Sequence, residues 1–316
     1  MPHRVLVDTT PSPLVLEALS RSCHLHDLSV DGEATLEAMG MFDGIYTYGH
    51  MPIDGAYLDR TPKVRVISNF GVGVDHIDLR AAADRGIPVG NTPDVLNGAT
   101  ADMTFALLLA AARNLVVGDR YARGPEFTQY DPNILLGAEV HGSNLGIVGL
   151  GKIGTEVARR ANGFDMRVLY HNRRRNLQAE SETGATYCKL EALLDQSDFV
   201  ALNCPLTPQT RHLIGTGQFA RMKSTAVLIN AARGGVVDHE ALLTALRDGE
   251  IAAAATDVTD PEPLPRDHPL LSVDNFIVAP HLGSATHRTR DAMGRGSVEN
   301  LLAGLGGRPL PTQITA

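Results

Sequence analysis

Three glycines in the segment GLGKIG have the spacing of a turn that binds the pyrophosphate of a dinucleotide. Gly149 would allow the sharp turn, Gly151 would let backbone N–H groups approach the phosphates, and Gly154 would let a helix pack on the preceding strand. Because the chain has 31 glycines, the apolar run before the motif and the helical pattern after it make the assignment specific. The N-terminus of that helix would also attract the anion. The cofactor-binding residues predicted at this turn are Gly149, Gly151, Lys152, Ile153 and Gly154.

Three consecutive arginines follow the next predicted strand, in the segment LYHNRRRN. About 20 residues after such a glycine motif, an acidic residue normally binds the 2′-hydroxyl of the adenosine ribose. No acid stands here, and guanidinium groups would instead face a doubly charged 2′-phosphate. The sequence therefore predicts NADP(H) as cofactor, with weaker use of NAD(H), and Asn172, Arg173 and Arg174 as contacts. Arg175 is predicted to face solvent, and an ordinary solvated run of charge is the alternative for all three arginines.

Short β-branched runs alternate with helical patterns along the whole chain, which predicts an α/β fold with parallel sheets. The predicted strands begin at Arg4, Val64, Leu145, Arg167, Asp198, Thr225 and Asn275. The segment CHLH, from Cys23 to His26, alternates as an exposed strand or a loop would. No internal repeat of fixed period interrupts this pattern.

Two helices are predicted in detail. Asp238 can cap a helix that presents Leu242 and Leu246 on one face and stops at Gly249. A second helical pattern, residues 100–117, is apolar on nearly every side, as in a buried helix.

The composition narrows the class of protein. A chain of 316 residues is longer than one core usually supports, so two domains are expected. A net charge of -8 argues against nucleic-acid and membrane partners, which require an excess of positive charge. The three cysteines form no CxxC pair, so we expect no disulfide framework and no metal site. With no apolar run of signal-peptide or membrane-span length, we expect a cytoplasmic protein.

Five motifs together resemble one enzyme family. GVGVDHID, GLGKIG, NAARGGVVD, DVTDPEPLP and PHLGSAT occur in the order found in the D-isomer-specific 2-hydroxyacid dehydrogenases. Within that family, DVTDPEPLP, HPLL and PHLGSATHRTR are most similar to glyoxylate and hydroxypyruvate reductases. The resemblance implies a homodimer. It also implies a Rossmann-type, doubly wound cofactor domain, residues 98–284, inserted in a smaller flavodoxin-like substrate domain made of residues 1–97 and 285–316.

The family's catalytic residues correspond to Arg233, Glu262 and His281. Reduction of a 2-oxo acid places negative charge on the carbonyl oxygen, so a proton donor must stand beside it, and His281 would be that acid. Glu262 would favour the imidazolium form that carries the proton. Arg233 would bind the substrate carboxylate with two planar donors. Each of the three residue types also occurs for packing or turn reasons, so their joint presence at predicted strand ends carries the assignment.

A second glycine-rich loop is predicted to hold the substrate. Gly71 and Gly73 free the backbone around Val72 to direct N–H groups at an anion, and a tight βα turn would need the same glycines. In the resembled family this loop binds the substrate carboxylate, so the substrate-binding set is Val72, Gly73 and Arg233. The resemblance also implies a cofactor site, with Asp257 near the nicotinamide carboxamide, lined by Thr104, Cys204, Ala231, Ala232, Asp257, His281, Gly283 and Ser284.

The chain departs from the family in having no tryptophan, which related reductases often place near the active site from the partner subunit. Phe127 and Tyr130 are predicted to take its place, and residues 47–52 to lie at the mouth of the substrate pocket. Glyoxylate and hydroxypyruvate are the first choices of substrate. A longer 2-oxo acid, such as 2-ketogluconate or an aryl pyruvate, remains open, as does a dinucleotide-sensing protein related to corepressors. A formate-dehydrogenase-like reaction is disfavoured, because that resemblance would put another residue at Glu262.

Overall fold

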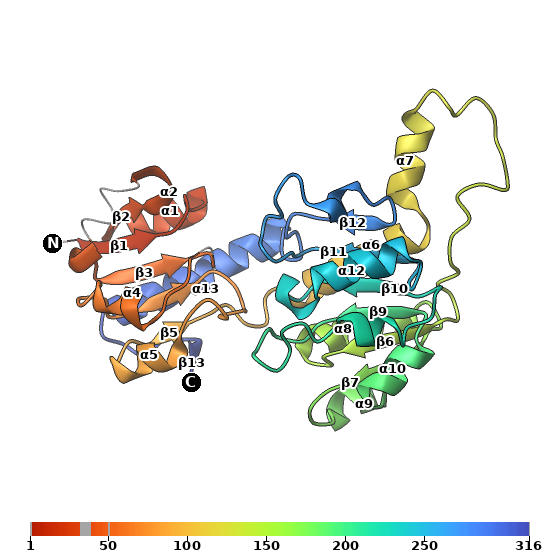
Figure 1. Cartoon of the computed structure of the whole chain (residues 1–316). Coiled ribbons are helices and arrows are strands. Elements are labelled where there is room, and N and C mark those ends of the chain that lie inside the picture. Colours follow the sequence, from red (N-terminus) through yellow and green to blue (C-terminus); the bar gives the residue numbers. More distant parts are fainter. Residues whose placement is uncertain (1, 32–38, 50, 316) are drawn as a thin grey trace. The chain divides into compact units, whose positions relative to one another are not determined.

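The computed structural model describes residues 2–31, 39–49 and 51–315 (Figure 1). The chain forms two compact units, one made of Met1–Leu96 with Thr286–Ala316 and the other of Asn97–Ala285. The domain borders expected from the sequence differ from these by one residue at each junction. We call the first the substrate unit and the second the nucleotide unit, and describe each by itself.

The nucleotide unit is built on a seven-stranded parallel sheet with the order β12-β11-β10-β9-β6-β7-β8. Its strands in chain order are β6 (Asn144–Val148), β7 (Arg167–His171), β8 (Thr186–Tyr187), β9 (Phe199–Leu202), β10 (Val227–Asn230), β11 (Ala253–Thr256) and β12 (Phe276–Val278). From β6 the chain moves outward to β8 and then returns to the other side of β6 at β9. The loops after β6 and β9 therefore diverge, and such a switch point is where open α/β sheets bind ligands.

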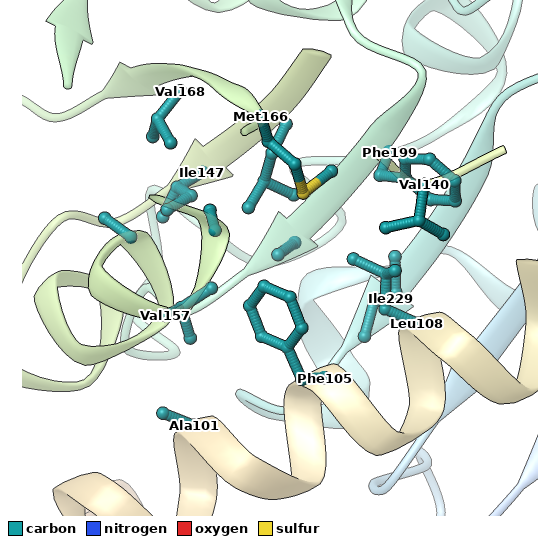
Figure 2. Close-up of a cluster of buried hydrophobic side chains, with 14 of the residues drawn as sticks. Ala101, Phe105, Leu108, Val140, Ile147, Val157, Met166, Val168, Phe199 and Ile229 are labelled. Carbon is teal, nitrogen blue, oxygen red and sulfur yellow. The ribbon is translucent and has the colours of Figure 1, made fainter. Parts of the chain in front are cut away.

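Helices cover both faces of this sheet, so its strands are buried on both sides. Side chains alternate between two cores: Ile147 points into one, and the adjacent Val148 points into the other. Figure 2 shows the first core, in which Phe105 of α6 (Asn97–Ala112) and Val157 of α8 (Lys152–Asn162) meet the sheet. The second core lies under α10 (Leu190–Gln196), α11 (Thr216–Phe219) and α12 (His239–Arg247).

The helix predicted over residues 100–117 is wrong at its C-terminal end. Helix α6 stops at Ala112, and α7 (Leu115–Arg123) begins after a bend of 59°. Asn114 makes the bend in a left-handed conformation, φ 51°, which asparagine tolerates better than most residues. Its side-chain amide donates to the carbonyls of Leu135 and Leu136, so the bend is tied to a distant segment that helical periodicity does not register.

Among the described residues, no single helix has the length and apolarity that a membrane span requires, although the bent pair α6 and α7 reaches that threshold together. Eight of the 16 residues of α6 are buried inside the nucleotide unit, all of them between Thr100 and Ala112. The prediction of a buried helix is therefore confirmed over residues 100–112.

The substrate unit has a six-stranded sheet with the order β13-β5-β4-β3-β1-β2, parallel except for the edge strand β13. Its elements are β1 (His3–Val7), α1 (Pro13–Ser20), β2 (Cys23–Asp27), α2 (Leu28–Asp31), β3 (Gly44–Thr47), α4 (Gly55–Asp59), β4 (Ile67–Asn69), α5 (Leu79–Asp84), β5 (Val89–Gly90), α13 (His287–Leu305) and β13 (Gln313–Ile314). The C-terminal helix α13 packs on β3 and β4, where the Ser297 carbonyl accepts from Ser68 Oγ at 2.7 Å. Two chain segments far apart in sequence thus build one core.

The α/β fold with a Rossmann-like nucleotide unit confirms the predicted fold class. Helix α12 also forms as predicted: the Asp238 carboxylate caps it and Gly249, φ 71°, follows its end. The segment CHLH belongs to strand β2. Strand β11 was not predicted, because its alanine-rich sequence has little intrinsic preference for a strand and owes its conformation to burial between β10 and β12.

Candidate active site

The glycine turn between β6 and α8 has the geometry that its sequence predicts. Gly149 has φ 103°, and a Cβ there would lie 2.6 Å from Cys204 N, so only glycine fits. A Cβ on Gly154 would lie 2.2 Å from the Gly149 carbonyl oxygen, because helix and turn touch at this point. In contrast, a Cβ on Gly151, the N-cap of α8, would have no heavy atom within 4 Å. The start of α8 is therefore open to the approach of a phosphate.

The arginine segment is tied to this turn by two asparagines. Asn172 Oδ1 accepts from the Leu150 N–H at 2.7 Å, and Asn176 Nδ2 donates to the Leu150 carbonyl at 2.9 Å. Asn176 also caps α9 (Leu177–Thr183) by accepting from Ala179 N. The structure thus gives Asn172 a role in holding the turn, and its predicted contact with the cofactor stays a prediction.

The three arginines differ in their partners. Arg173 and Arg174 are exposed, and neither makes a hydrogen bond or ion pair with any residue that the structure describes. Arg175 donates through Nε and Nη2 to the two oxygens of Glu180, at 3.0 and 2.6 Å. Its side chain is 56% exposed, as expected for a solvent-facing residue, but this ion pair fixes it in place. Two guanidinium groups therefore remain available at the end of β7 for an anion.

Asn203 directly follows strand β9, on the other side of β6, and is a residue that sequence reasoning missed. Both polar atoms of its side-chain amide are buried without a hydrogen-bond partner among the described residues. Such groups are normally satisfied by water or a ligand. Its backbone lies against Gly149, at the switch point of the sheet. The adjacent Cys204 has a thiol whose pKa is raised to about 11 by burial, so it stays protonated at neutral pH.

The segment after β10 carries Arg233 and is fixed by Asn230. The Asn230 side chain accepts from Ala232 N at 3.0 Å and donates to the Arg233 carbonyl at 2.9 Å. The next residue, Gly234, lies very close to Thr259. A Cβ on Gly234 would lie 2.0 Å from the carbonyl carbon of Thr259. The segment that carries Arg233 therefore packs directly on the segment that leads to Glu262.

His281 and Glu262 form an ion pair in which Nδ1 lies 2.6 Å from Oε1. Burial would raise the pKa of Glu262, but the hydrogen bond from His281 and the positive charges of His281 and Arg233 lower it below its usual range. Glu262 Oε2 also accepts from Thr259 N at 3.2 Å, which fixes the carboxylate. Because Nδ1 is engaged, Nε2 is the ring nitrogen left to exchange a proton with a substrate.

This arrangement of a nucleotide-binding turn and a carboxylate-paired histidine agrees with the comparisons to known proteins. Residues 105–283 match the family model described as D-isomer specific 2-hydroxyacid dehydrogenase, NAD binding domain. The chain belongs to the D-isomer-specific 2-hydroxyacid dehydrogenases.

Curated relatives of this dehydrogenase are named glyoxylate reductase. That of Korarchaeum cryptofilum is 50% identical over 253 residues, which cover 80% of this chain and 76% of the relative. That of Aeropyrum pernix is 42% identical over 322 residues and covers 98% of this chain and 95% of the relative.

Solved structures resemble the dehydrogenase over almost its full length. A protein of Thermus thermophilus is 43% identical with a TM-score of 0.90, over 99% of this chain and 100% of that one. Another solved structure is that of an NADPH-dependent glyoxylate/hydroxypyruvate reductase of Sinorhizobium meliloti in complex with NADP and malonate. It is 32% identical with a TM-score of 0.89, over 99% of this chain and 97% of that one.

Asp257 of the dehydrogenase holds the loop that follows His281. Its two carboxylate oxygens accept from the N–H groups of Leu282 and Gly283, each at 2.6 Å. Burial raises the pKa of Asp257, against the opposing effect of these two hydrogen bonds. Its predicted contact with the nicotinamide carboxamide stays a prediction, and the structure adds a role in positioning the loop.

Several predicted cofactor-lining residues lie around this loop and the strand ends. Gly283 is buried, and a Cβ there would lie 3.1 Å from Asp257 Oδ2 and 3.4 Å from Thr100. Ser284 is also buried. Thr104 is fully buried on α6 and donates its hydroxyl hydrogen to the Thr100 carbonyl at 2.9 Å. Ala231 and Ala232 lie in the segment held by Asn230.

The predicted carboxylate-binding loop belongs to the substrate unit, after β4. Asn69 Nδ2 donates to the Gly73 carbonyl at 2.9 Å, and Asn91 Nδ2 donates to the Val72 carbonyl at 2.9 Å. The N–H groups of Val72 and Gly73 have no hydrogen-bond acceptor within the part of the chain that the structure describes. With the carbonyls fixed and these N–H groups free, the loop is suited to an anion.

The other predicted pocket residues have simple surroundings. Phe127 and Tyr130 follow α7 and are 50% and 80% exposed. Thr47 is buried and donates to Asp8 Oδ2 at 2.6 Å, so it belongs to the core of the substrate unit. His50 lies outside the described residues. Among the described residues, no group of three or more His, Cys, Asp or Glu side chains is placed so that it could hold a metal ion.

Proposed function

We propose that this dehydrogenase uses NADPH to reduce small 2-oxo acids, first of all glyoxylate and hydroxypyruvate, to D-2-hydroxy acids. The observation that carries the proposal is the ion pair between His281 and Glu262. The positive charge of Arg233 also acts on Glu262 and lowers its pKa. The glyoxylate reductases among its relatives support the substrate class.

In this proposal NADPH supplies a hydride to the carbonyl carbon. His281 donates the proton from Nε2 to the carbonyl oxygen as negative charge develops there. The Glu262 carboxylate is hydrogen-bonded to Nδ1, and its fixed position orients the ring. In the reverse direction the neutral Nε2 accepts the proton of the hydroxyl group.

Two groups would bind the substrate carboxylate. The guanidinium of Arg233 offers two parallel donors and keeps positive charge near the developing oxyanion. The N–H groups of Val72 and Gly73, which have no acceptor among the described residues, are a second predicted set of donors for a carboxylate. The Arg233 guanidinium would orient the 2-oxo acid so that its carbonyl oxygen faces the imidazole.

The preference for NADPH would come from Arg173 and Arg174. Both are exposed and lack an internal carboxylate partner in the described chain, so their charge is available to a 2′-phosphate. An open α8 N-terminus and the close contact of Gly149 with Cys204 suit the pyrophosphate at the adjacent turn.

We also infer that the enzyme is a homodimer. In Figure 1, α7 and the segment that follows it (yellow) extend away from the seven-stranded sheet. This region exposes large apolar side chains that monomeric proteins seldom cluster on their surface. The exposed side chains are Leu115, Phe127, Tyr130, Ile134, Leu135 and Leu136.

We further propose a cytoplasmic location. The three free cysteines support it, because disulfides are rare in that compartment.

The test is a panel of 2-oxo acids of increasing length, each assayed with NADPH and with NADH. We expect the highest kcat/KM for glyoxylate or hydroxypyruvate with NADPH. A preference for an aryl or sugar-derived 2-oxo acid would correct the substrate, and a preference for NADH would correct the cofactor. Tight binding of NADPH without turnover of any 2-oxo acid would contradict an enzymatic role.

A further inference from the structure

A carboxylate lies beside the arginine segment. Glu180, on α9, binds Arg175 through both oxygens and also accepts the hydroxyl hydrogen of Tyr170, which belongs to β7. Its side chain is only 17% exposed, although the residue stands at the surface of the nucleotide unit. Arg175 also lies over the ring of Tyr187, with 5.8 Å from its guanidinium carbon to the ring centroid. Charge, hydrogen bonds and ring contact thus keep these side chains in one place.

The same contacts fix the backbone of the arginine segment at both ends. Tyr170 Oη accepts from Asn176 N at 2.9 Å, and Asn176 and Asn172 both bind Leu150. Between these anchors, only Arg173 and Arg174 have side chains without a partner among the described residues. Glu180 is therefore close to the place where a 2′-phosphate is expected, and its own negative charge opposes such a ligand.

We propose that Arg175 neutralises Glu180, and that this neutralisation is what allows Arg173 and Arg174 to select a 2′-phosphorylated nucleotide. The inference rests on the proposed use of NADPH. It assigns Arg175 and Glu180 as positioning and specificity-determining residues without contact to the phosphate.

The proposed effect of Arg175 on selectivity follows from the net charge around Arg173 and Arg174. An acidic residue after the second strand of a dinucleotide-binding sheet normally binds the ribose hydroxyl groups and repels a 2′-phosphate. Hydrogen bonds from Arg175 and Tyr170 lower the pKa of Glu180 to about 2, so the carboxylate stays ionised at neutral pH. Without Arg175, Glu180 would present an uncompensated negative charge beside Arg173 and Arg174, and would compete with the phosphate for them.

The experiment measures binding of two cofactor fragments that lack nicotinamide, so it does not depend on turnover. Calorimetry with adenosine 2′,5′-bisphosphate and with adenosine 5′-monophosphate gives the ratio of the two dissociation constants as the 2′-phosphate preference. Arg175→Ala is expected to lower this preference about tenfold, because one charge is removed and another is exposed. Arg175→Lys keeps the charge and is expected to keep the preference.

The decisive variant is Arg175→Ala combined with Glu180→Gln. Because glutamine can still accept the Tyr170 hydroxyl hydrogen without carrying a charge, the preference should return to within about threefold of wild type. Glu180→Gln alone should raise the preference. Glu182→Gln is the matched control, since Glu182 is on the same helix but binds Arg159, and its change should leave the preference unaltered.

The outcomes separate this inference from the proposed function. A loss in Arg175→Ala that Glu180→Gln does not restore would mean that Arg175 binds the phosphate itself, and would overturn the neutralising role. An unchanged preference in Arg175→Ala would overturn it as well, with NADPH use intact. Equal binding of both fragments by the wild type would overturn the NADPH proposal and this inference together. Thermal unfolding of each variant without ligand checks that the nucleotide unit remains folded.

Discussion

Asp257 fixes the backbone on which His281 is carried. The Asp257 carbonyl accepts from His281 N at 2.9 Å, and the Asp257 carboxylate accepts from the next two N–H groups. His281 has φ 56°, a left-handed conformation that costs a residue other than glycine about 1–2 kcal/mol. The hydrogen bonds to Asp257 offset this strain and hold the imidazole toward Glu262.

Asp257→Asn tests this role. An amide can accept only with its oxygen, so one of the two N–H groups loses its partner and meets an NH₂ group instead. We expect kcat to fall roughly 10- to 100-fold, since a small displacement of a catalytic group is costly. The dissociation constant for NADPH, measured by fluorescence, should change much less. A variant with full kcat would show that the loop holds its shape without the carboxylate.

His281→Ala removes the proposed proton donor. Turnover should fall about 10²- to 10⁴-fold, the usual contribution of a general acid, while NADPH still binds. Stopped-flow measurement of NADPH oxidation, with cofactor binding followed in parallel, checks both parts. An unimpaired rate would remove His281 from the mechanism.

Glu262→Gln removes the negative charge beside His281 but retains an oxygen that can accept its hydrogen bond. We expect kcat for reduction to fall roughly 10- to 100-fold, because the neutral amide holds and orients the imidazole less firmly than the carboxylate does. In the wild type, the ion pair between Glu262 and His281 should persist at moderately acidic pH. Because the pKa of Glu262 lies below its ordinary value of 4.5, the stability that the ionised carboxylate contributes is present above that pH and is lost only as the pH falls further. Steady-state kinetics of reduction provide the measurement, and a variant with the kcat of the wild type would argue against the pairing.

Sequence reasoning predicted the backbone geometry of the glycine turn better than the side-chain contacts around it. The spacing of Gly149, Gly151 and Gly154 reports backbone geometry directly, and each position has the surroundings that its type requires. The bond between Arg175 and Glu180 could not be read from the sequence, since it depends on how α9 turns back toward β7. The bend at Asn114 likewise depends on carbonyls 21 and 22 residues away.

The sequence also contains a signal for the ligand edge of the sheet that did not enter the predictions, namely an asparagine at the end of each of two predicted strands. Asn203 and Asn230 stand at the carboxyl ends of the predicted strands DFVALN and TAVLIN. In a parallel sheet these ends face the ligand edge, where a polar side chain has a reason to follow an apolar run. The amide of Asn203 is buried and has no hydrogen-bond partner in the described part of the chain, whereas Asn230 fixes the Arg233 segment. Their side-chain contacts still had to come from the three-dimensional structure.

The double variant Arg173→Ala and Arg174→Ala tests the choice of cofactor. Each charge-assisted hydrogen bond contributes about 1.5–3 kcal/mol before ordering costs, so KM for NADPH should rise by roughly two orders of magnitude. KM for NADH should remain nearly unchanged, because the ribose hydroxyl makes no comparable contact with the guanidinium groups. Steady-state kinetics with both cofactors provide the measurement. Equal losses for NADPH and NADH would contradict a role specific to the phosphate.

Gly151→Ala and Gly154→Ala separate cofactor binding from folding at one turn. A methyl group on Gly151 has free space around it, so the cofactor-free enzyme should keep its midpoint of thermal unfolding. The same methyl group would stand where backbone and pyrophosphate must approach, so the dissociation constant for NADPH should rise at least about tenfold. A methyl group on Gly154 instead collides with the Gly149 carbonyl and should destabilise the free enzyme by about 1–3 kcal/mol. Calorimetric unfolding with and without NADPH distinguishes the two, and a Gly151→Ala enzyme that binds NADPH normally would place the phosphates elsewhere.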